Sequence, residues 1–182
     1  MRIDVAFVPV IDGAAVDARM VADLSSEEQD ALRRLGVPAD RDRAATARVT
    51  ARRKLGRRMG IHPRHVPRIT PLAPWGKPYV DNASIGVSWS HSGRWVALAI
   101  ADRGPVGVDI EQQPFRVPLR ALAMLDLASM EDFVAREAAG KVTGQGLAGT
   151  WPAGVTVRSL SAPAGYLAAV AAPDGELSID VC

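Results

Sequence analysis

The sequence is poor in cysteine and in aromatic residues. Its 182 residues include one cysteine, Cys182, and only 5% of them are Phe, Trp or Tyr. A single cysteine excludes an intramolecular disulfide and also a metal site built from several thiolates. The apolar stretch at residues 1–16 contains Asp4 and Asp12, so it predicts neither a secretory signal nor a membrane span. We therefore expect a cytoplasmic protein with no membrane partner.

The excess of positive charge is small, with a formal net charge of +2, but the charges are unevenly distributed. Residues 31–68 contain twelve Lys or Arg against two acidic residues, whereas residues 109–182 contain five against nine. This division predicts one half that contacts an anion and another that binds a cation, with a solvated basic helix as the simpler alternative. The basic region lacks interleaved aromatic residues and a known reader motif, so we expect no nucleic-acid partner.

Periodicity and turn residues predict a chain of mixed helices and strands. Ser25, with Glu28 three residues later, has the pattern of a capping box, so a helix is predicted to begin there and to end at Gly36. The other predicted elements are helices at 40–59 and 130–141, a proline-rich loop at 61–85, and strands at 3–10, 86–90, 95–101, 106–111, 155–160, 165–172 and 177–181.

The predicted helix at 40–59 carries an alanine-rich apolar stripe. Its small and apolar residues recur every three or four positions, which places them on one buried face. These residues are Ala44, Ala47, Ala51, Leu55 and Met59. The arginines Arg48, Arg52 and Arg53 are expected on the helix surface, with a structural ion pair as the alternative for Arg52.

Residues 106–111 alternate between apolar and polar side chains. A side-chain period of two puts the Val and Ile residues on one face of a strand and Asp109 and Glu111 on the other. Two carboxylates about 7 Å apart, with the small Gly107 leaving room beside them, suit Mg²⁺ bound together with a phosphate. A solvated strand edge is the simpler explanation of such a pair when it is considered alone.

Three shorter features are informative only in combination. Glu137 and Lys141 lie four residues apart on one helix face, a spacing that usually makes a surface ion pair. Lys77 stands between a glycine and a proline, which shape the backbone around one cation. Ser-His-Ser at residues 90–92 is an ordinary turn sequence when considered alone.

Several short motifs follow one another along the chain. They are Leu24-Ser25, Asp40-Arg-x-Arg43, Gly76-Lys77-Pro78, Trp89-Ser-His-Ser-Gly93, Gly107-Val-Asp-Ile-Glu111, and Phe133-x-x-Arg136-Glu137-Ala138-x-x-Lys141 leading to Gly144-x-Gly146-Leu147. In this order and spacing they resemble the 4′-phosphopantetheinyl transferase superfamily, specifically its longer, monomeric surfactin-synthetase-activator type. The resemblance covers residues 24–172, and each motif alone is weak.

The resemblance implies an enzyme that transfers the phosphopantetheine arm of coenzyme A to a serine of an acyl or peptidyl carrier protein and releases 3′,5′-ADP. It implies that Asp109, Glu111 and Glu137 bind Mg²⁺, or Mn²⁺ in its place, against the coenzyme A pyrophosphate. Catalysis would involve Asp109, Glu137 as the base for the carrier serine, directly or through a water, and Lys141 beside the departing phosphate. The implied coenzyme A contacts are Arg43 and His91 on the 3′-phosphate, Lys77 beside the adenine and phosphates, and Ser90.

The implied fold is α+β, with two similar α+β subdomains related by a pseudo-twofold axis and a ligand cleft between them. We divide the chain into an N-terminal half at residues 1–103 and a C-terminal half at residues 104–182. The first holds the basic helix and the Gly-Lys-Pro and Ser-His-Ser motifs, and the second holds the Asp-x-Glu strand and the Glu/Lys helix. The longer type is usually monomeric and of broad specificity, which favours a carrier protein of polyketide or nonribosomal peptide synthesis.

The chain departs from the family pattern between Glu111 and Phe133, where relatives usually have a longer segment with another acidic motif. Asp126 or Glu131 would have to replace that acid. Two alternatives follow. One is a coenzyme A-binding protein of this fold with weak or lost catalysis. The other is a Mg²⁺-dependent nuclease built on the Asp-x-Glu pair, although position 113 holds Gln where such enzymes usually have lysine.

Overall fold

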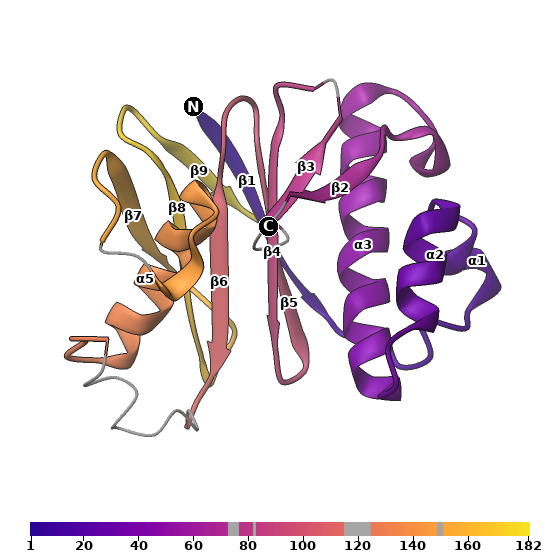
Figure 1. Ribbon diagram of the computed structural model, residues 1–182, viewed down its shortest axis with the longest axis horizontal. Helices are drawn as coiled ribbons and strands as arrows, with labels where there is room; N and C mark the ends of the chain where they lie inside the picture. The colour runs from indigo at the N-terminus through magenta and orange to yellow at the C-terminus, as the bar shows by residue number, and fades with distance from the viewer. Residues whose placement is uncertain (73–76, 82, 115–124, 149–150) are drawn as a thin grey trace.

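A computed structural model of the chain describes residues 1–72, 77–81, 83–114, 125–148 and 151–182 (Figure 1). Strands β6 and β4 lie in the middle of the molecule, with α5 on one flank and α3 on the other. The helices are α1 (Ala18–Val21), α2 (Ser26–Arg33), α3 (Pro38–Met59) and α5 (Met130–Thr143), with 3₁₀ turns at Pro63–His65 and Gly146–Ala148. The strands are β1 (Arg2–Pro9), β2 (Ile69–Leu72), β3 (Lys77–Val80), β4 (Gly86–Ser92), β5 (Trp95–Ala101), β6 (Gly107–Gln112), β7 (Val155–Leu160), β8 (Tyr166–Pro173) and β9 (Ser178–Val181).

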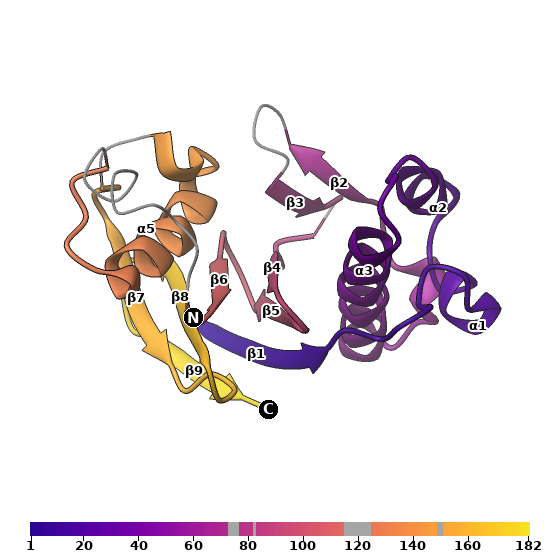
Figure 2. The same ribbon diagram turned by 90° about the horizontal axis from the view of Figure 1, so that it is seen from below.

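The described strands form two larger sheets and one hairpin. The four-stranded sheet has the order β4-β5-β1-β9, in which β5 pairs antiparallel with both neighbours and β9 runs parallel to β1. The three-stranded sheet has the order β6-β8-β7 and is antiparallel throughout. Strands β2 and β3 form a separate hairpin (Figure 2). Its Ile69 and Val80 pack in one buried cluster with Val87, Leu98 and Ile100 of the four-stranded sheet. The α+β class predicted from the sequence is confirmed, and the pseudo-twofold relation stays a prediction.

The last strand does not stay with its neighbours in the sequence. Strands β7 and β8 belong to the three-stranded sheet, but β9 crosses to the other sheet, where Ile179 lies opposite Ile3 of β1. Arg2 on β1 donates a hydrogen bond to Asp180 on β9 at 2.9 Å. The division at residues 103 and 104 therefore matches the two sheets except for this strand, and as a domain boundary it stays a prediction.

One buried cluster joins the two larger sheets. It takes residues from β1, β5, β6 and β8, together with Val106, and many of them are alanines whose short side chains allow close packing. The cluster consists of Ile3, Val5, Ala97, Ala99, Ala101, Val106, Val108, Ile110, Ala168, Val170 and Ala172. The apolar face predicted for residues 106–111 is thus fully buried, as the alternation indicated.

Helix α3 buries the alanine stripe that the sequence predicted. Ala47, Ala51 and Leu55 are fully buried, and Ala44 is nearly so. The helix begins at Pro38, where proline suits the first turn because its missing N–H needs no partner there. It ends at Gly60, whose φ of +68° is the left-handed conformation that glycine adopts at low cost.

Arg52 does not lie on the helix surface. Its side chain is 1% exposed and forms an ion pair with Glu28 at the start of α2. Its Nη1 donates to two backbone carbonyls, those of Pro63 and Val66, at 2.9 and 3.1 Å. The alternative of a structural ion pair is confirmed, and the surface position first expected is wrong, because packing of α2 and of the turn after α3 covers this arginine.

Several predicted boundaries differ from the structure. Strand β4, predicted to end at residue 90, continues to Ser92, so the Ser-His-Ser sequence lies in the strand and not in the turn. The region at 61–85, expected to be a loop, contains the 3₁₀ turn and the β2–β3 hairpin, because short proline-containing strands carry little periodic signal. Helix α2 begins at the predicted capping box of Ser25 and Glu28 but ends at Arg33, before Gly36. Its cap residue, Arg34, keeps right-handed backbone angles, so this end of the helix needs no glycine.

Candidate active site

Helix α5 lies directly against strand β6 because Gly107 has no side chain. A Cβ at this position would lie 2.0 Å from the carbonyl oxygen of Ala138 and 3.0 Å from the Cβ of Lys141. The interpretation that Gly107 leaves room for a phosphate is therefore wrong, since the helix occupies that space. The close approach instead brings residues of α5 next to the carboxylates of β6.

The structure places the three predicted metal-binding carboxylates together. Asp109 and Glu111 come from β6 and Glu137 comes from α5, and one oxygen of each lies within 4.8 Å of the others. Asp109 is fully buried, whereas the other two are partly buried. Hard oxygen ligands at these separations are the donors that Mg²⁺ and Mn²⁺ prefer.

Lys141 balances only part of this negative charge. Its ammonium donates to Asp109 Oδ1 at 2.6 Å and to the carbonyl of Val108 at 3.0 Å. Its distance to Glu137 Oε1, the helix neighbour with which it was expected to pair, is 3.9 Å. When all groups are ionised, three carboxylates and one ammonium leave two negative charges in excess, which is the charge that a divalent cation neutralises.

The surroundings of the cluster raise the pKa of two of its carboxyl groups. Burial, followed by the charge of Asp109, raises the pKa of Glu137 to about 7, and Lys141 opposes that shift. Burial likewise raises the pKa of Glu111, against the hydrogen bond from Ser92. Both shifts express the cost of gathering like charges away from water.

The chemistry of the donor set fits a divalent cation. Asp109 Oδ1 already accepts hydrogen bonds from Lys141 and from Ser90, the latter at 2.7 Å. Asp109 Oδ2 is buried and has no hydrogen-bond partner among the described residues. A buried carboxylate oxygen without a donor is costly unless something else neutralises it, and a cation held by all three carboxylates would do so.

Two of the predicted coenzyme contacts lie close enough to interact electrostatically. Arg43 on α3 donates to the carbonyl of Gly93 at 3.2 Å, forms an ion pair with Asp40 at 2.6 Å, and lines a cavity of about 370 Å³. Desolvation lowers the pKa of His91 on β4, and the Arg43 cation lowers it further. The side chain of Lys77 lies outside the described part of the structure.

Ser90 points toward the carboxylates rather than standing alone. It follows Trp89 in β4, and its hydroxyl donates to Asp109, as described above. The acid candidates Asp126 and Glu131 are both exposed and do not belong to the three-carboxylate cluster. Residues 115–124, within the shortened segment, lie outside the described residues.

Sequence reasoning missed two features near the site. Ser92 donates to Glu111 Oε2 at 2.7 Å, although it was quoted only as part of a motif. Its alternation with Ser90 along one strand was the signal that could have identified it. Arg48, expected on the surface, lies with its guanidinium 5.9 Å from the centre of the Trp89 ring, and burial lowers its pKa.

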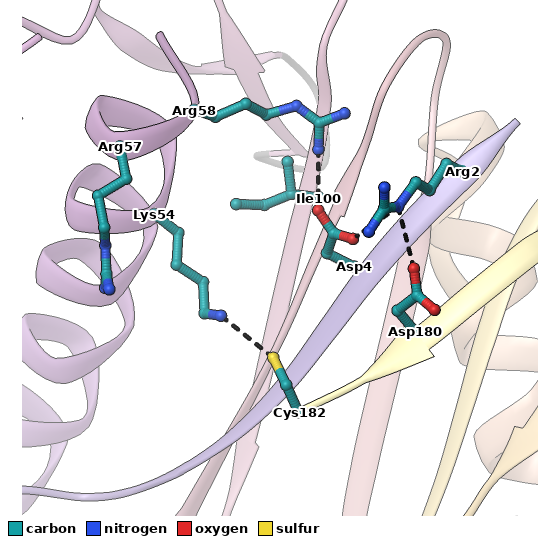
Figure 3. Close-up of a pocket in the computed structure, with 8 residues that line it drawn as sticks. All are labelled: Arg2, Asp4, Lys54, Arg57, Arg58, Ile100, Asp180 and Cys182. Carbon is teal, nitrogen blue, oxygen red and sulfur yellow. Dashed lines mark hydrogen bonds and ion pairs between the residues drawn. The ribbon is translucent and has the colours of Figure 1, made fainter. Parts of the chain in front are cut away.

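A separate hollow of about 590 Å³ is lined by none of the predicted site residues (Figure 3). Within it Lys54 donates to the sulfur of Cys182 at 3.3 Å, and Arg58 donates to Asp4 at 3.0 Å. The lining residues are Arg2, Asp4, Lys54, Arg57, Arg58, Ile100, Asp180 and Cys182. Much of its charge is thus internally paired, and it is distinct from the carboxylate cluster.

Comparison with known proteins supports the resemblance. No family model matches the chain. A 4′-phosphopantetheinyl transferase of Bacillus subtilis is 30% identical over 100 residues, which are 54% of this chain and 43% of the relative. A phosphopantetheinyl transferase of Thraustochytrium is 32% identical over 99 residues, or 53% of this chain and 34% of the relative. The matches therefore span less than half the length of each relative.

These two relatives confirm the resemblance to the phosphopantetheinyl transferase superfamily. The longer, surfactin-synthetase-activator type remains a prediction. In the part of the chain that the structure describes, no helix combines the length and apolar character that a membrane span requires.

Proposed function

We propose that this chain, as a relative of the phosphopantetheinyl transferases, moves the 4′-phosphopantetheine arm of coenzyme A onto a serine of an acyl or peptidyl carrier protein. The observation that carries the proposal is the convergence of Asp109, Glu111, Glu137 and Lys141 at the junction of β6 and α5. Phosphoryl transfer depends chiefly on charge neutralisation and positioning, and a cation held by this cluster would supply both.

Asp109, Glu111 and Glu137 would hold Mg²⁺, or Mn²⁺ in its place. Bound there, the cation would offset the negative charge of the coenzyme A pyrophosphate. The excess negative charge of the cluster and the unpartnered Asp109 Oδ2 support this assignment.

The reaction forms one bond and breaks one bond at phosphorus. The carrier serine oxygen attacks the phosphorus that bears the pantetheine arm, and the bridging bond to the nucleotide breaks, so that 3′,5′-ADP leaves. Glu137 takes the serine proton, directly or through a water. Lys141, whose ammonium contacts Asp109, would stabilise or protonate the departing phosphate.

The coenzyme A contacts form part of the same proposal. Arg43 and His91 would bind its 3′-phosphate, and their electrostatic proximity supports a shared anionic ligand. Lys77 would lie beside the adenine and phosphates, and Ser90 would contact the coenzyme near the metal. We further propose a cytoplasmic monomer that serves a polyketide or nonribosomal peptide carrier.

The test is intact-mass spectrometry of an apo carrier protein incubated with this protein, coenzyme A and Mg²⁺. The expected result is a mass gain of one phosphopantetheine that requires the metal and is lost in Glu137→Ala. Arg53→Ala is the matched control, because Arg53 pairs with Asp23 away from the cluster and should leave transfer unchanged.

Two other outcomes would redirect the proposal. Tight coenzyme A binding with no mass gain on several carriers would favour the alternative of a binding protein that has lost catalysis. If the protein neither bound coenzyme A nor modified any carrier, the proposed function would be overturned. Nucleic-acid cleavage independent of coenzyme A would instead support the nuclease alternative.

A further inference from the structure

Strands β4 and β6 meet through side chains where the two larger sheets lie side by side (Figure 1). They belong to different sheets, so no backbone-to-backbone ladder joins them. Hydrogen bonds from the backbone of β6 to alternate serine side chains of β4 connect the two strands instead. Ser88 accepts the N–H of Val108, and Ser92 accepts the N–H of Gln112, each at 3.1 Å. We call Ser88, Ser90 and Ser92 the seam serines.

Two of the seam serines also contact the carboxylates of the cluster. The hydroxyl of Ser90 donates to Asp109 Oδ1, and the hydroxyl of Ser92 donates to Glu111 Oε2, both at 2.7 Å. Ser92 therefore accepts from the backbone of β6 and donates to a side chain of β6 at once. Its hydroxyl proton points to Glu111, because an ionised carboxylate can only accept a hydrogen bond.

Each of these hydrogen bonds fixes one oxygen of a carboxylate and leaves the other oxygen for a ligand. For Asp109 the oxygen left over is Oδ2, which is fully buried and has no partner among the described residues. For Glu111 the oxygen left over is Oε1. A carboxylate held by one oxygen loses less rotational freedom when its second oxygen binds a cation, so the site is prepared before the cation arrives.

From this geometry we propose that Ser90 and Ser92 are positioning residues, which orient Asp109 and Glu111 across the seam for a divalent cation. The inference rests on the proposed function, since it assumes a cation at that cluster. In this proposal, serines of strand β4 orient the cation ligands Asp109 and Glu111 on β6. Strand β4 also carries His91, a proposed contact of the coenzyme A 3′-phosphate, so hydroxyl groups would connect the anion-binding residues to the cation-binding residues.

Ser88 provides a control within the same seam. It bridges to the backbone of β6 as Ser92 does, but its hydrogen bond is to Val108 rather than to a carboxylate. Ser88→Ala should lower stability, because Ser88 is 2% exposed and the change leaves a buried N–H without an acceptor. It should leave cation affinity within about twofold, since the carboxylates keep their own donors.

The experiment is a Mn²⁺ titration of the whole chain by isothermal calorimetry, with and without coenzyme A, beside thermal unfolding of each variant. Ser92→Ala is expected to weaken Mn²⁺ binding about tenfold or more, the usual range for a lost second-layer hydrogen bond. Ser92→Thr, which keeps the hydroxyl, is expected to restore most of that affinity. Ser90→Ala should weaken binding in the same direction.

The outcomes separate this inference from the proposed function. If the wild-type chain binds Mn²⁺ and Ser92→Ala binds it equally tightly, the positioning role is overturned while the cation site stands. Equal losses in Ser92→Ala and Ser88→Ala would also overturn it, because they would indicate a general effect of the seam. A wild-type chain that binds no Mn²⁺ would overturn the cation site itself and the inference with it.

Discussion

Two groups of buried charge in this protein use similar side chains in opposite ways. Between α2 and α3, one arginine meets one glutamate, and two backbone carbonyls accept hydrogen bonds from Nη1 of Arg52. Between β6 and α5, three carboxylates meet one ammonium, that of Lys141. The first group is balanced in charge and holds helices together. The second keeps an excess of negative charge, which is a cost unless a cation is bound.

An unpartnered carboxylate oxygen does not by itself distinguish the two groups. Glu28 Oε1 and Asp109 Oδ2 are both buried without a hydrogen-bond partner in the described part of the chain. What differs is the balance of charge and the number of carboxylates that converge. The net charge therefore separates the two groups, whereas a single unsatisfied atom does not.

The balanced pair should be the more costly one to break. Arg52→Ala leaves Glu28 charged and buried without its partner, so we expect a loss of about 3–5 kcal/mol in the free energy of unfolding. Urea denaturation followed by circular dichroism measures it. Arg53→Ala is the control, because its partly exposed pair with Asp23 should contribute at most about 1 kcal/mol. Equal losses of unfolding free energy in the two variants would show that the buried Arg52 pair contributes no more to stability than the partly exposed Arg53 pair.

In the unbalanced group, losing one charge should affect activity rather than folding. Asp109→Asn is expected to lower the rate of transfer by about 10²–10³-fold, since it removes a preorganised charge from the reacting centre. Its loss of stability should be smaller than that of Arg52→Ala, because one of three repelling carboxylates becomes neutral. Carrier modification rates and urea denaturation measure the two effects, with the exposed Asp180→Asn as control. A variant that transfers at the wild-type rate would contradict the assignment of Asp109.

The position of helix α5 depends on the absence of a side chain at Gly107. Gly107→Ala would place a methyl group against the Ala138 carbonyl, so we expect about 1–3 kcal/mol of destabilisation by overpacking. Transfer should fall as well, because Glu137 and Lys141 move with the helix. Gly36→Ala is a matched control, since nothing lies within 4 Å of its added Cβ. If both glycine variants unfolded at the same temperature, the close contact would not be needed.

The unbalanced group should also respond to pH. Glu137 binds a cation only when deprotonated, so cation affinity should rise about tenfold per pH unit up to about pH 7 and level off above it. Without a cation the sign for stability is the reverse: the raised pKa means that stability falls as pH increases from the ordinary value of 4.5 to about 7. Mn²⁺ titrations at several pH values test the first effect. Glu137→Gln should reduce the slope to the part that Glu111 contributes, because the pKa of Glu111 is also raised. An unchanged slope would assign the proton to another group.

Much of the candidate site was predictable because its residues lie at local spacings. Asp109 and Glu111 share one face of a strand, and Glu137 and Lys141 share one face of a helix, so each pair follows from periodicity alone. The capping box at Ser25 and the glycine that ends α3 are equally local signals. In contrast, no local pattern indicated that Gly107 seats a helix, because that contact joins residues about thirty positions apart.

The sequence by itself determined the α+β class, most helix and strand boundaries, and the four residues proposed to carry out the chemistry. The boundaries follow from side-chain periods and capping residues, which act over a few residues. The fold class and the roles of the four residues follow from the family resemblance that the ordered motifs carry. Tertiary structure alone decided that Arg52 is buried with Glu28, that β9 returns to β1, and that Ser92 holds Glu111. Each of these joins distant segments, and their free energy depends on burial and on which donors remain unpaired, quantities that exist only once the chain has folded.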